Sequence, residues 1–178
     1  MPNKIIAVVG MCGSGKSELT DTFIANGWRR VYFGGVTMSE LERRGLPVTP
    51  ENERNVREEL RAKHGMAAFA VSLLPEIEAA LEQGNVVLDG LYSWSEYKYL
   101  SERLPVKVTL LAVVTNRALR YSRLETRNER PLTPEQAAAR DYAEIENLEK
   151  GGPIADADVY LTNNGTKEEF KEKIAAFM

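Results

Sequence analysis

A glycine-rich loop that directly follows an apolar run is the feature that most constrains how this chain folds. Residues 5–9 read IIAVV and residues 10–17 read GMCGSGKS, which matches the pattern G-x-x-x-x-G-K-[ST]. A helical segment, 18–25, comes next. Between a strand and a helix this pattern binds nucleotide phosphates, because the backbone N–H groups of the loop and the positive end of the helix face them. An ordinary glycine-rich turn is the alternative interpretation.

The same motif predicts which residues bind ATP and Mg²⁺. We expect Lys16 to contact the β- and γ-phosphates and Ser17 to bind Mg²⁺. Cys12 lies inside the loop, where either a tolerated small residue or a redox-sensitive thiol would fit. The other nucleotide-binding residues predicted in this segment are Gly10, Gly13, Ser14, Gly15 and Glu18.

Apolar runs rich in β-formers recur along the chain and alternate with longer helical stretches. After residues 5–9 they are 31–33, 86–88, 106–114 and 159–161. Such alternation is typical of a parallel sheet covered by helices on both faces. We therefore predict a three-layer α/β/α fold of the P-loop NTPase class, with a mainly parallel, five-stranded sheet, in which residues 1–178 form a single domain.

A long helical region separates the second apolar run from the third. About fifty residues lie between them, more than an ordinary crossover needs. We predict a helical insertion over about 36–84 that binds the acceptor, with a plain helical cover for the sheet as the alternative. Helix starts are marked by Thr49-Pro50 and by capping-box sequences at Thr133 and Thr166.

Charge, cysteine and histidine content exclude several classes of function. The 23 Lys and Arg residues against 26 Asp and Glu residues give a net charge of -3 and no general reason to expect nucleic acid or a membrane as partner. One cysteine, Cys12, and one histidine, His64, exclude an internal disulfide and a His/Cys zinc site. The N-terminal apolar run is too short for a signal peptide. We expect a cytoplasmic protein, either a monomer or a small homo-oligomer.

An acidic residue ends the third apolar run. Asp89 follows residues 86–88 and precedes Gly90. The carboxyl end of a buried strand emerges at the edge of the sheet where open α/β folds bind ligands, beside the glycine-rich loop. Asp89 is therefore predicted to hold Mg²⁺ through water or to face the acceptor. A simple Asp-Gly turn after a strand is the alternative.

Five arginines recur at spacings of three or four near residue 120. On one continuous helix their directions fall within an arc of about 140°, and like charges so close together need anions to neutralise them. We predict an arginine lid over about 120–140, in which Arg123 and Arg127 take part in phosphoryl transfer. Pairing with Glu125 and Glu129 on a solvated face is the alternative. The five are Arg117, Arg120, Arg123, Arg127 and Arg130.

Together these segments resemble the nucleoside-monophosphate-kinase-like group of P-loop kinases, in particular dephospho-CoA kinase and adenylate-kinase-related proteins. The resemblance spans most of the chain and rests on GMCGSGKS, on VVLDG, on RPLTPEQAAARD and on ADVYLTNNGTKEEF. It implies an ATP-dependent kinase in which the backbone around Asn163, Asn164, Gly165 and Thr166 packs on the adenine. Locally, a turn into a helix explains Asn-Asn-Gly-Thr equally well.

The chain departs from that family in its acceptor-binding element. Gly35 stands where the relatives have an aspartate, and Met38 stands where an arginine often lies. Either another acid, such as Asp89 or Glu96, orients the acceptor in this protein, or its acceptor is different from that of the relatives. We predict a phosphotransferase that moves the γ-phosphoryl group of Mg-ATP to a nucleotide, a nucleoside or a dephospho-CoA-like compound. The alternative is a non-catalytic ATP-binding switch or sensor derived from such a kinase.

Overall fold

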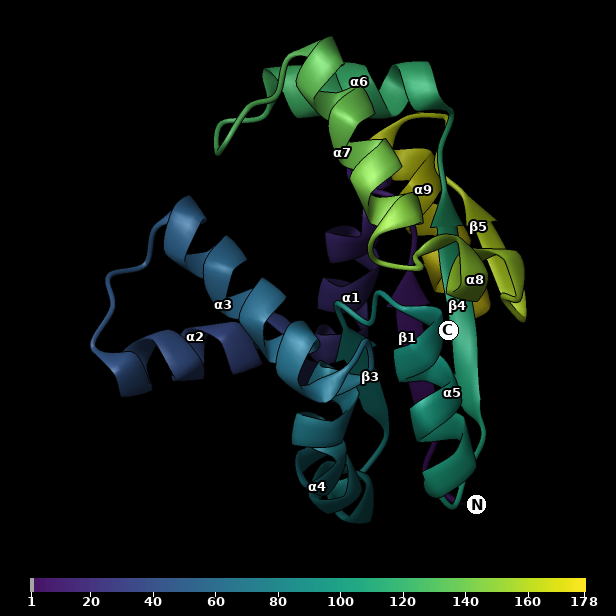
Figure 1. The fold of residues 1–178 in the computed structure, drawn as a ribbon. Coiled ribbons are helices and arrows are strands. Elements are labelled where there is room, and N and C mark those ends of the chain that lie inside the picture. The colour runs from purple at the N-terminus through teal and green to yellow at the C-terminus, as the bar shows by residue number, and fades with distance from the viewer. Residues whose placement is uncertain (1) are drawn as a thin grey trace.

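A five-stranded parallel sheet forms the centre of the protein, as seen in a computed structural model that describes residues 2–178 (Figure 1). The strand order is β2-β3-β1-β4-β5, and every pairing is parallel. This confirms the predicted α/β class and the predicted number of strands. The strands are β1 (Ile5–Val9), β2 (Arg29–Tyr32), β3 (Val86–Asp89), β4 (Val108–Val114) and β5 (Val159–Thr162).

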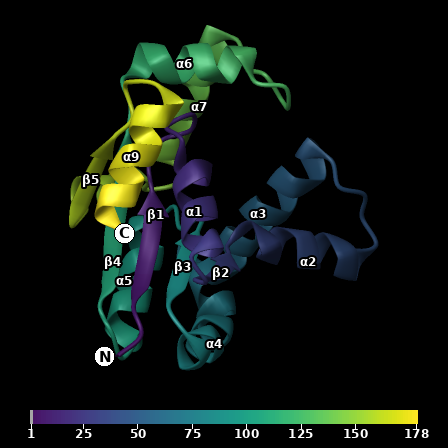
Figure 2. The same ribbon diagram turned by 180° about the vertical axis from the view of Figure 1, so that it is seen from behind.

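Helices cover both faces of the sheet, so the central strands β1, β3 and β4 are mostly apolar and buried on both sides. In β1, Ile5, Ala7 and Val9 pack toward one layer, while Ile6 and Val8 pack toward the other. Figure 2 views the molecule from behind, on the side of the sheet that the second layer covers. The first layer contains α4 (Ala68–Gln83), α5 (Trp94–Arg103) and α8 (Gly151–Ala155), and the second contains α1 (Lys16–Ala25) and α9 (Lys167–Phe177).

Two helix pairs extend beyond these layers (Figures 1 and 2). The first pair, α2 (Gly34–Arg44) and α3 (Pro50–His64), projects away from the sheet. The second pair, α6 (Arg117–Thr126) and α7 (Pro134–Glu146), lies over the end of the sheet where the glycine-rich loop is found. Since α4 packs on the sheet, the projecting part of the predicted insertion consists of α2 and α3.

Side-chain caps explain where several helices begin. Thr133 and Thr166 accept hydrogen bonds from the backbone N–H groups three residues later, and both predicted capping boxes are present. A third box, at Ser93 and Glu96, was not anticipated from the sequence. Across residues 2–178, no helix combines the length and apolarity that a membrane span requires.

Leu110 on β4 tests how strongly the sheet core supports the fold. Its side chain is fully buried, so Leu110→Ala is expected to lower the free energy of unfolding by about 2–5 kcal/mol, through lost burial and the cavity left behind. Chemical denaturation followed by circular dichroism measures this change. Leu46→Ala is the matched control, because Leu46 is 39% exposed and a change within about 0.5 kcal/mol is expected. Equal losses in both variants would contradict the assignment of Leu110 to the core.

Candidate active site

The glycine-rich loop joins β1 to α1, and its shape depends on three glycines. Gly10, Gly13 and Gly15 have φ angles of 147°, 80° and 100°, which side chains other than hydrogen rarely permit. A Cβ atom on Gly10 would lie 2.5 Å from the carbonyl oxygen of Val113, and one on Gly15 would lie 2.3 Å from Nδ2 of Asn163. The loop therefore needs glycine at these positions for both backbone conformation and space.

Lys16 begins α1, and its ammonium group turns back against the loop. Nζ donates to the carbonyl oxygens of Gly10 at 2.9 Å and Met11 at 3.0 Å. Burial, together with the nearby charge of Lys150, lowers the pKa of Lys16 from 10.5 to about 7. A buried cation bonded only to carbonyl groups favours the approach of an anion, because charge removed from water needs compensation.

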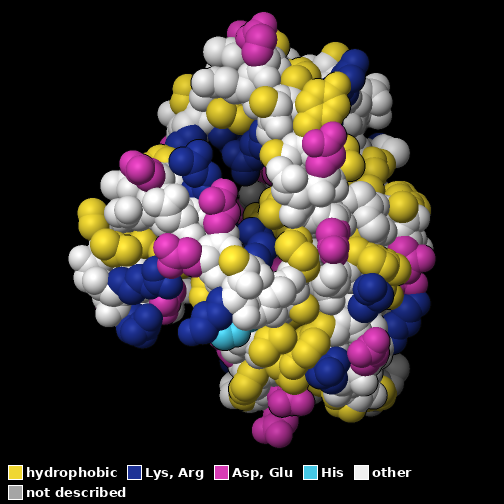
Figure 3. Space-filling view, viewed as in Figure 1, with side chains coloured by type: hydrophobic (Ala, Val, Ile, Leu, Met, Phe, Trp, Pro, Cys, Tyr) yellow, Lys and Arg dark blue, Asp and Glu magenta, His cyan; other side chains and the backbone are white. Residues whose placement is uncertain are grey.

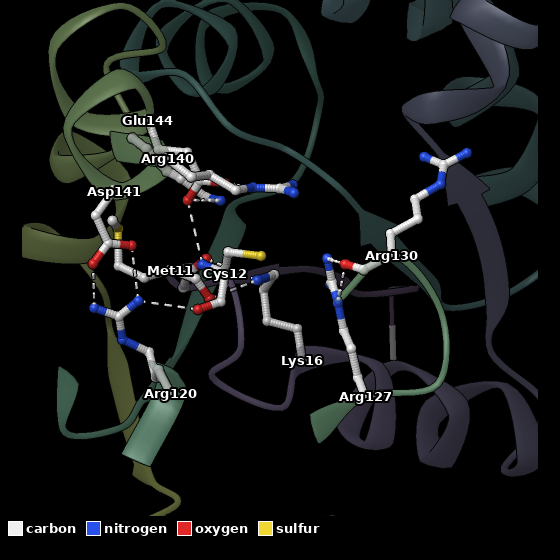
Figure 4. A network of polar contacts seen from close by, with 11 residues as sticks. Met11, Cys12, Lys16, Arg120, Arg127, Arg130, Arg140, Asp141 and Glu144 are labelled. Carbon is white, nitrogen blue, oxygen red and sulfur yellow. Dashed lines mark hydrogen bonds and ion pairs between the residues drawn. The ribbon is translucent and has the colours of Figure 1, made fainter. Parts of the chain in front are cut away.

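A charge cluster on and after α7, in which Glu144 and Lys150 are buried and Arg140 is exposed, lies on the other side of the loop (Figure 4). Oε2 of Glu144 accepts from the backbone N–H of Cys12 at 3.3 Å and from Nζ of Lys150 at 2.7 Å, while Oε1 accepts from Arg140 at 3.2 Å. Burial opposes ionisation, but Lys150 and Arg140 outweigh it and lower the pKa of Glu144. Neither Glu144 nor Lys150 was predicted as a site residue, although the i,i+4 spacing of Arg140 and Glu144 is a signal of pairing.

Arg120, on α6, bonds to both α7 and the glycine-rich loop. Its guanidinium group forms a bidentate pair with the Asp141 carboxylate, at 2.9 and 2.6 Å, and also donates to the carbonyl oxygen of Cys12 at 3.0 Å. Both side chains of the pair are buried. The pair ties α6 and α7 to each other and to the glycine-rich loop, and no local sequence pattern indicated it because the two residues lie on different helices.

The predicted helix face of five arginines is wrong, because α6 ends at Thr126. The chain then reverses, and the N–H of Leu132 donates to the carbonyl oxygen of Leu124 at 3.0 Å. Arg127 and Arg130 lie in this connection, where Nε of Arg127 donates to the carbonyl oxygen of Arg130 at 2.8 Å. Figure 4 shows Arg127 on the opposite side of Lys16 from the charge cluster on α7.

The tip of this connection contacts the projecting helix α3. Nη2 of Arg130 donates to Oε1 of Glu53 at 3.0 Å, and Glu53 also meets Arg57 at 3.5 Å. Arg130 adopts a positive φ of 49°, which is uncommon for a residue with a side chain. Neither Glu125 nor Glu129 forms an ion pair within residues 2–178. The acids that pair with Arg120 and Arg130 therefore lie on other helices, Asp141 on α7 and Glu53 on α3.

Figure 3 shows a hollow between the α2–α3 pair and the part of the molecule below α6 and α7. Lys and Arg side chains gather along its walls. The contact between Glu53 and Arg130 joins the two sides. The arrangement therefore places a basic hollow beside the glycine-rich loop.

Arg123 and the segment after β5 meet behind the loop. Arg123 donates to the carbonyl oxygen of Asn163 at 3.1 Å, and its Nη1 is buried with no hydrogen-bond partner among the described residues. Nδ2 of Asn163 donates to the carbonyl oxygen of Ser14 at 2.9 Å. Oδ1 of Asn164 accepts from the N–H of Asn116 at 2.8 Å. Asn163 thus supports the loop from behind.

Gly165 and Thr166 lie at the start of α9. The hydroxyl of Thr166 accepts from the N–H of Glu169 at 3.2 Å, and the Glu169 carboxylate accepts from the N–H of Thr166 at 2.7 Å. These bonds account for the local turn as a helix cap. Contact of this segment with adenine stays a prediction.

Asp89 ends β3, beside the first strand, and carries the carboxylate predicted for Mg²⁺. Arg30 donates to its Oδ2 through two nitrogens, at 2.9 and 2.5 Å, so Oδ1 has no hydrogen bond among the described residues. Ser17 is exposed in the first turn of α1, and Glu18 pairs with Lys167 at 3.1 Å. Mg²⁺ is commonly bound by one or two carboxylates with phosphates and water, and the Ser17 hydroxyl and Oδ1 of Asp89 suit that role.

The second acid considered for the acceptor, Glu96, is used as a helix cap. Its Oε2 accepts from the N–H groups of Tyr92 and Ser93, both at 2.9 Å. Burial raises the pKa of Glu96 although those N–H groups oppose the shift. Gly35 and Met38, the positions that depart from the family pattern, lie in the first half of α2. Of the two acids, Asp89 is therefore the accessible one, because its side chain is 23% exposed whereas Glu96 is buried.

Comparison with known proteins agrees with this architecture. The family model described as an AAA domain matches residues 6–148. A UPF0200 protein of Thermococcus gammatolerans is 36% identical over 174 residues, covering 96% of this chain and 91% of the relative. The UPF0200 protein PH1008 of Pyrococcus horikoshii is 32% identical over 174 residues, covering 96% and 93%.

Solved structures share the fold at low sequence identity. TT1252 from Thermus thermophilus gives a TM-score of 0.62 at 21% identity, covering 99% of this chain and 97% of that one. Shikimate kinase from Bacteroides thetaiotaomicron gives 0.59 at 15%, covering 98% and 96%. Dephospho-CoA kinase from Campylobacter jejuni gives 0.55 at 14%, covering 98% and 95%. With its sequence relatives, its AAA-domain match and this P-loop kinase fold, the chain belongs to the UPF0200 family.

Proposed function

We propose that this protein is a P-loop kinase that transfers the γ-phosphoryl group of Mg-ATP to a small-molecule acceptor. The observation that carries the proposal is the half-buried ammonium group of Lys16, which bonds to carbonyl oxygens of a loop of positive-φ glycines. It lies at the edge of the sheet where α/β folds bind ligands, next to a basic hollow. The kinases among the structural neighbours support the proposal by analogy of fold alone.

In the proposed reaction, an acceptor oxygen forms a bond to the γ-phosphorus as the bond from that phosphorus to the β–γ bridging oxygen breaks. ADP leaves with the electron pair of the broken bond, and the acceptor proton passes to a base or to water. Lys16 and Arg127 would stabilise the charge on the transferred group. Arg123 bonds to Asn163 behind the loop, so its proposed part in the transfer requires its Nη1, unpaired among the described residues, to turn toward the phosphates. Asp89 is the carboxylate proposed to face the acceptor.

The remaining residues of the proposed site bind and orient the nucleotide. Ser17 and Asp89 would hold Mg²⁺, which neutralises charge on the β- and γ-phosphates when bound. The segment from Asn164 to Thr166 is proposed to contact the adenine. The cytoplasmic location and the monomeric or small homo-oligomeric state stay predictions.

Lys16→Ala tests the kinase proposal. We expect Mg-dependent ADP release from ATP, stimulated by one member of a panel of nucleoside monophosphates, nucleosides, dephospho-CoA and hydroxy acids. Loss of the Lys16 ammonium should lower kcat/KM at least about a hundredfold, because a donor that stabilises transition-state charge is removed. A coupled assay for ADP measures the rate.

Lys98→Ala is the matched control for that variant, because Lys98 is exposed on α5. It should retain wild-type turnover. Tight ATP binding without turnover on any acceptor would instead favour the non-catalytic switch. An equal loss in both variants would contradict the role given to Lys16.

Nucleotide binding should depend on pH through Lys16. Its pKa of about 7 leaves most of the ammonium deprotonated at pH 8, whereas bound phosphates favour the charged form. Binding should therefore take up a proton above pH 7, and affinity should fall as the pH rises, by at most about tenfold per pH unit. Calorimetry at pH 8 in two buffers of different ionisation enthalpy measures the uptake.

Lys16→Arg is the control for this proton uptake, because a guanidinium group stays protonated at pH 8. Its nucleotide binding should show no uptake attributable to residue 16. Equal uptake in the wild type and in this variant would assign the proton to another group.

A further inference from the structure

Arg61, in the last turn of α3, carries a charge that the protein does not neutralise. Its guanidinium group stacks on the ring of Phe69, with Cζ 4.8 Å from the ring centroid. Its Nε is buried and has no hydrogen-bond partner, and it forms no ion pair, within residues 2–178. Because an arginine in a protein stays protonated, this half-buried guanidinium group is a cation without an ion-pair partner among the described residues.

The nearest arginine on the same face of α3 adds to this excess of positive charge. Arg57 lies one turn before Arg61 and reaches an acid only at 3.5 Å, the carboxylate of Glu53. That carboxylate is shared with Arg130, which approaches more closely, at 3.0 Å. One buried acid thus serves two arginines, while Arg61 has none.

The acids whose charges act on Arg61 do not neutralise it. Burial lowers the pKa of Arg61, and the charge of Glu96 only partly offsets this. The Glu96 carboxylate is already bonded to the backbone N–H groups of Tyr92 and Ser93. Glu58 also acts on Arg61 but lies exposed to water, where its field is screened.

Tyr92 links Arg61 to the site beside the glycine-rich loop. The adjacent Ser93 donates through Oγ to the carbonyl oxygen of Met66, just after α3, at 3.2 Å, and the Tyr92 ring lies 4.6 Å from Nζ of Lys150. Burial raises the pKa of Tyr92 to about 12, so its neutral hydroxyl can donate a hydrogen bond. The segment of Tyr92 and Ser93 therefore contacts both the chain just after α3, which carries Arg61, and the charge cluster beside the loop.

We propose that Arg61, assisted by Arg57, binds an anionic group of the phosphoryl acceptor, either a phosphate monoester or a carboxylate. This inference rests on the proposed kinase function and narrows its acceptor class. A guanidinium fork binds two oxygens of such a group, and the anion supplies the counter-charge that the protein lacks. Neutral alcohols and unphosphorylated nucleosides are then poor acceptors.

Pairs of acceptors that differ in one anionic group test this inference. ADP release is measured with adenosine against AMP, and with glycerol against glycerol 3-phosphate and glycerate. We expect turnover with anionic members only, and the phosphate and carboxylate arms distinguish the two chemistries. Equal turnover of neutral and anionic members would overturn the inference while leaving kinase activity established.

Arg61→Gln should raise KM for the anionic acceptor about 10- to 100-fold, because a charged hydrogen-bonding partner is lost, and should leave KM for ATP unchanged. Arg103→Gln, on α5 and exposed to water, is the matched control and should behave as wild type. An unchanged KM in Arg61→Gln would also overturn the inference.

A binding measurement separates failure of this inference from failure of the kinase proposal. Inorganic phosphate and acetate are titrated into protein saturated with Mg²⁺ and a non-hydrolysable ATP analogue. We expect the wild type to bind at least one of them, and Arg61→Gln to bind it at least tenfold more weakly. Such a difference without turnover on any acceptor would support the anion site and count against the kinase. Equal binding in both proteins would overturn the anion site.

Thermal unfolding distinguishes binding from a purely structural role. Removal of a half-buried charge that has no ion-pair partner among the described residues should leave the Tm of Arg61→Gln unchanged or raised. A role limited to stacking on Phe69 would lower Tm and leave KM unchanged, which would overturn the inference. Arg61→Lys keeps the charge without the fork, so it should fold and give an intermediate KM.

Discussion

The backbone of the glycine-rich loop is the feature around which the rest of the site is arranged. Three glycines at positive φ allow the loop to curve over the Lys16 ammonium. Side chains from three separate elements then bind its backbone: Glu144 at the N–H of Cys12, Arg120 at the carbonyl of Cys12, and Asn163 at the carbonyl of Ser14. A loop held in this way keeps its shape before any anion arrives, so binding costs little conformational entropy.

Electrostatic imbalance is the second property of the site. The acids near the loop are already used: Asp141 pairs with Arg120, Glu144 with Lys150, and Glu53 with Arg130. Lys16 and Arg61 remain without an ion pair among the described residues. Since a charge withdrawn from water is costly without a partner, both positions favour anionic ligands. The same reasoning links the nucleotide end of the proposed site to its acceptor end.

Local patterns predicted much of the architecture and less of the site. The loop motif, the five apolar runs and the caps at Thr133 and Thr166 depend on neighbours within a few residues, and the structure confirms them. The prediction that five arginines share one helix face was wrong, because spacing alone does not reveal where a helix ends. The helix α6 ends at Thr126. Glu96 looked like a candidate base, yet its carboxylate caps α5.

By itself, the sequence determined the order of strands and helices and the phosphate-binding loop, because glycine conformation and alternating burial act over short stretches of chain. Only the tertiary structure decided which charges meet. Asp141 lies 21 residues from Arg120, and Glu53 lies 77 residues from Arg130. Such pairs depend on how helices dock against the sheet. Which cation is left without a partner, as at Arg61, is therefore a property of the folded protein and not of any segment of it.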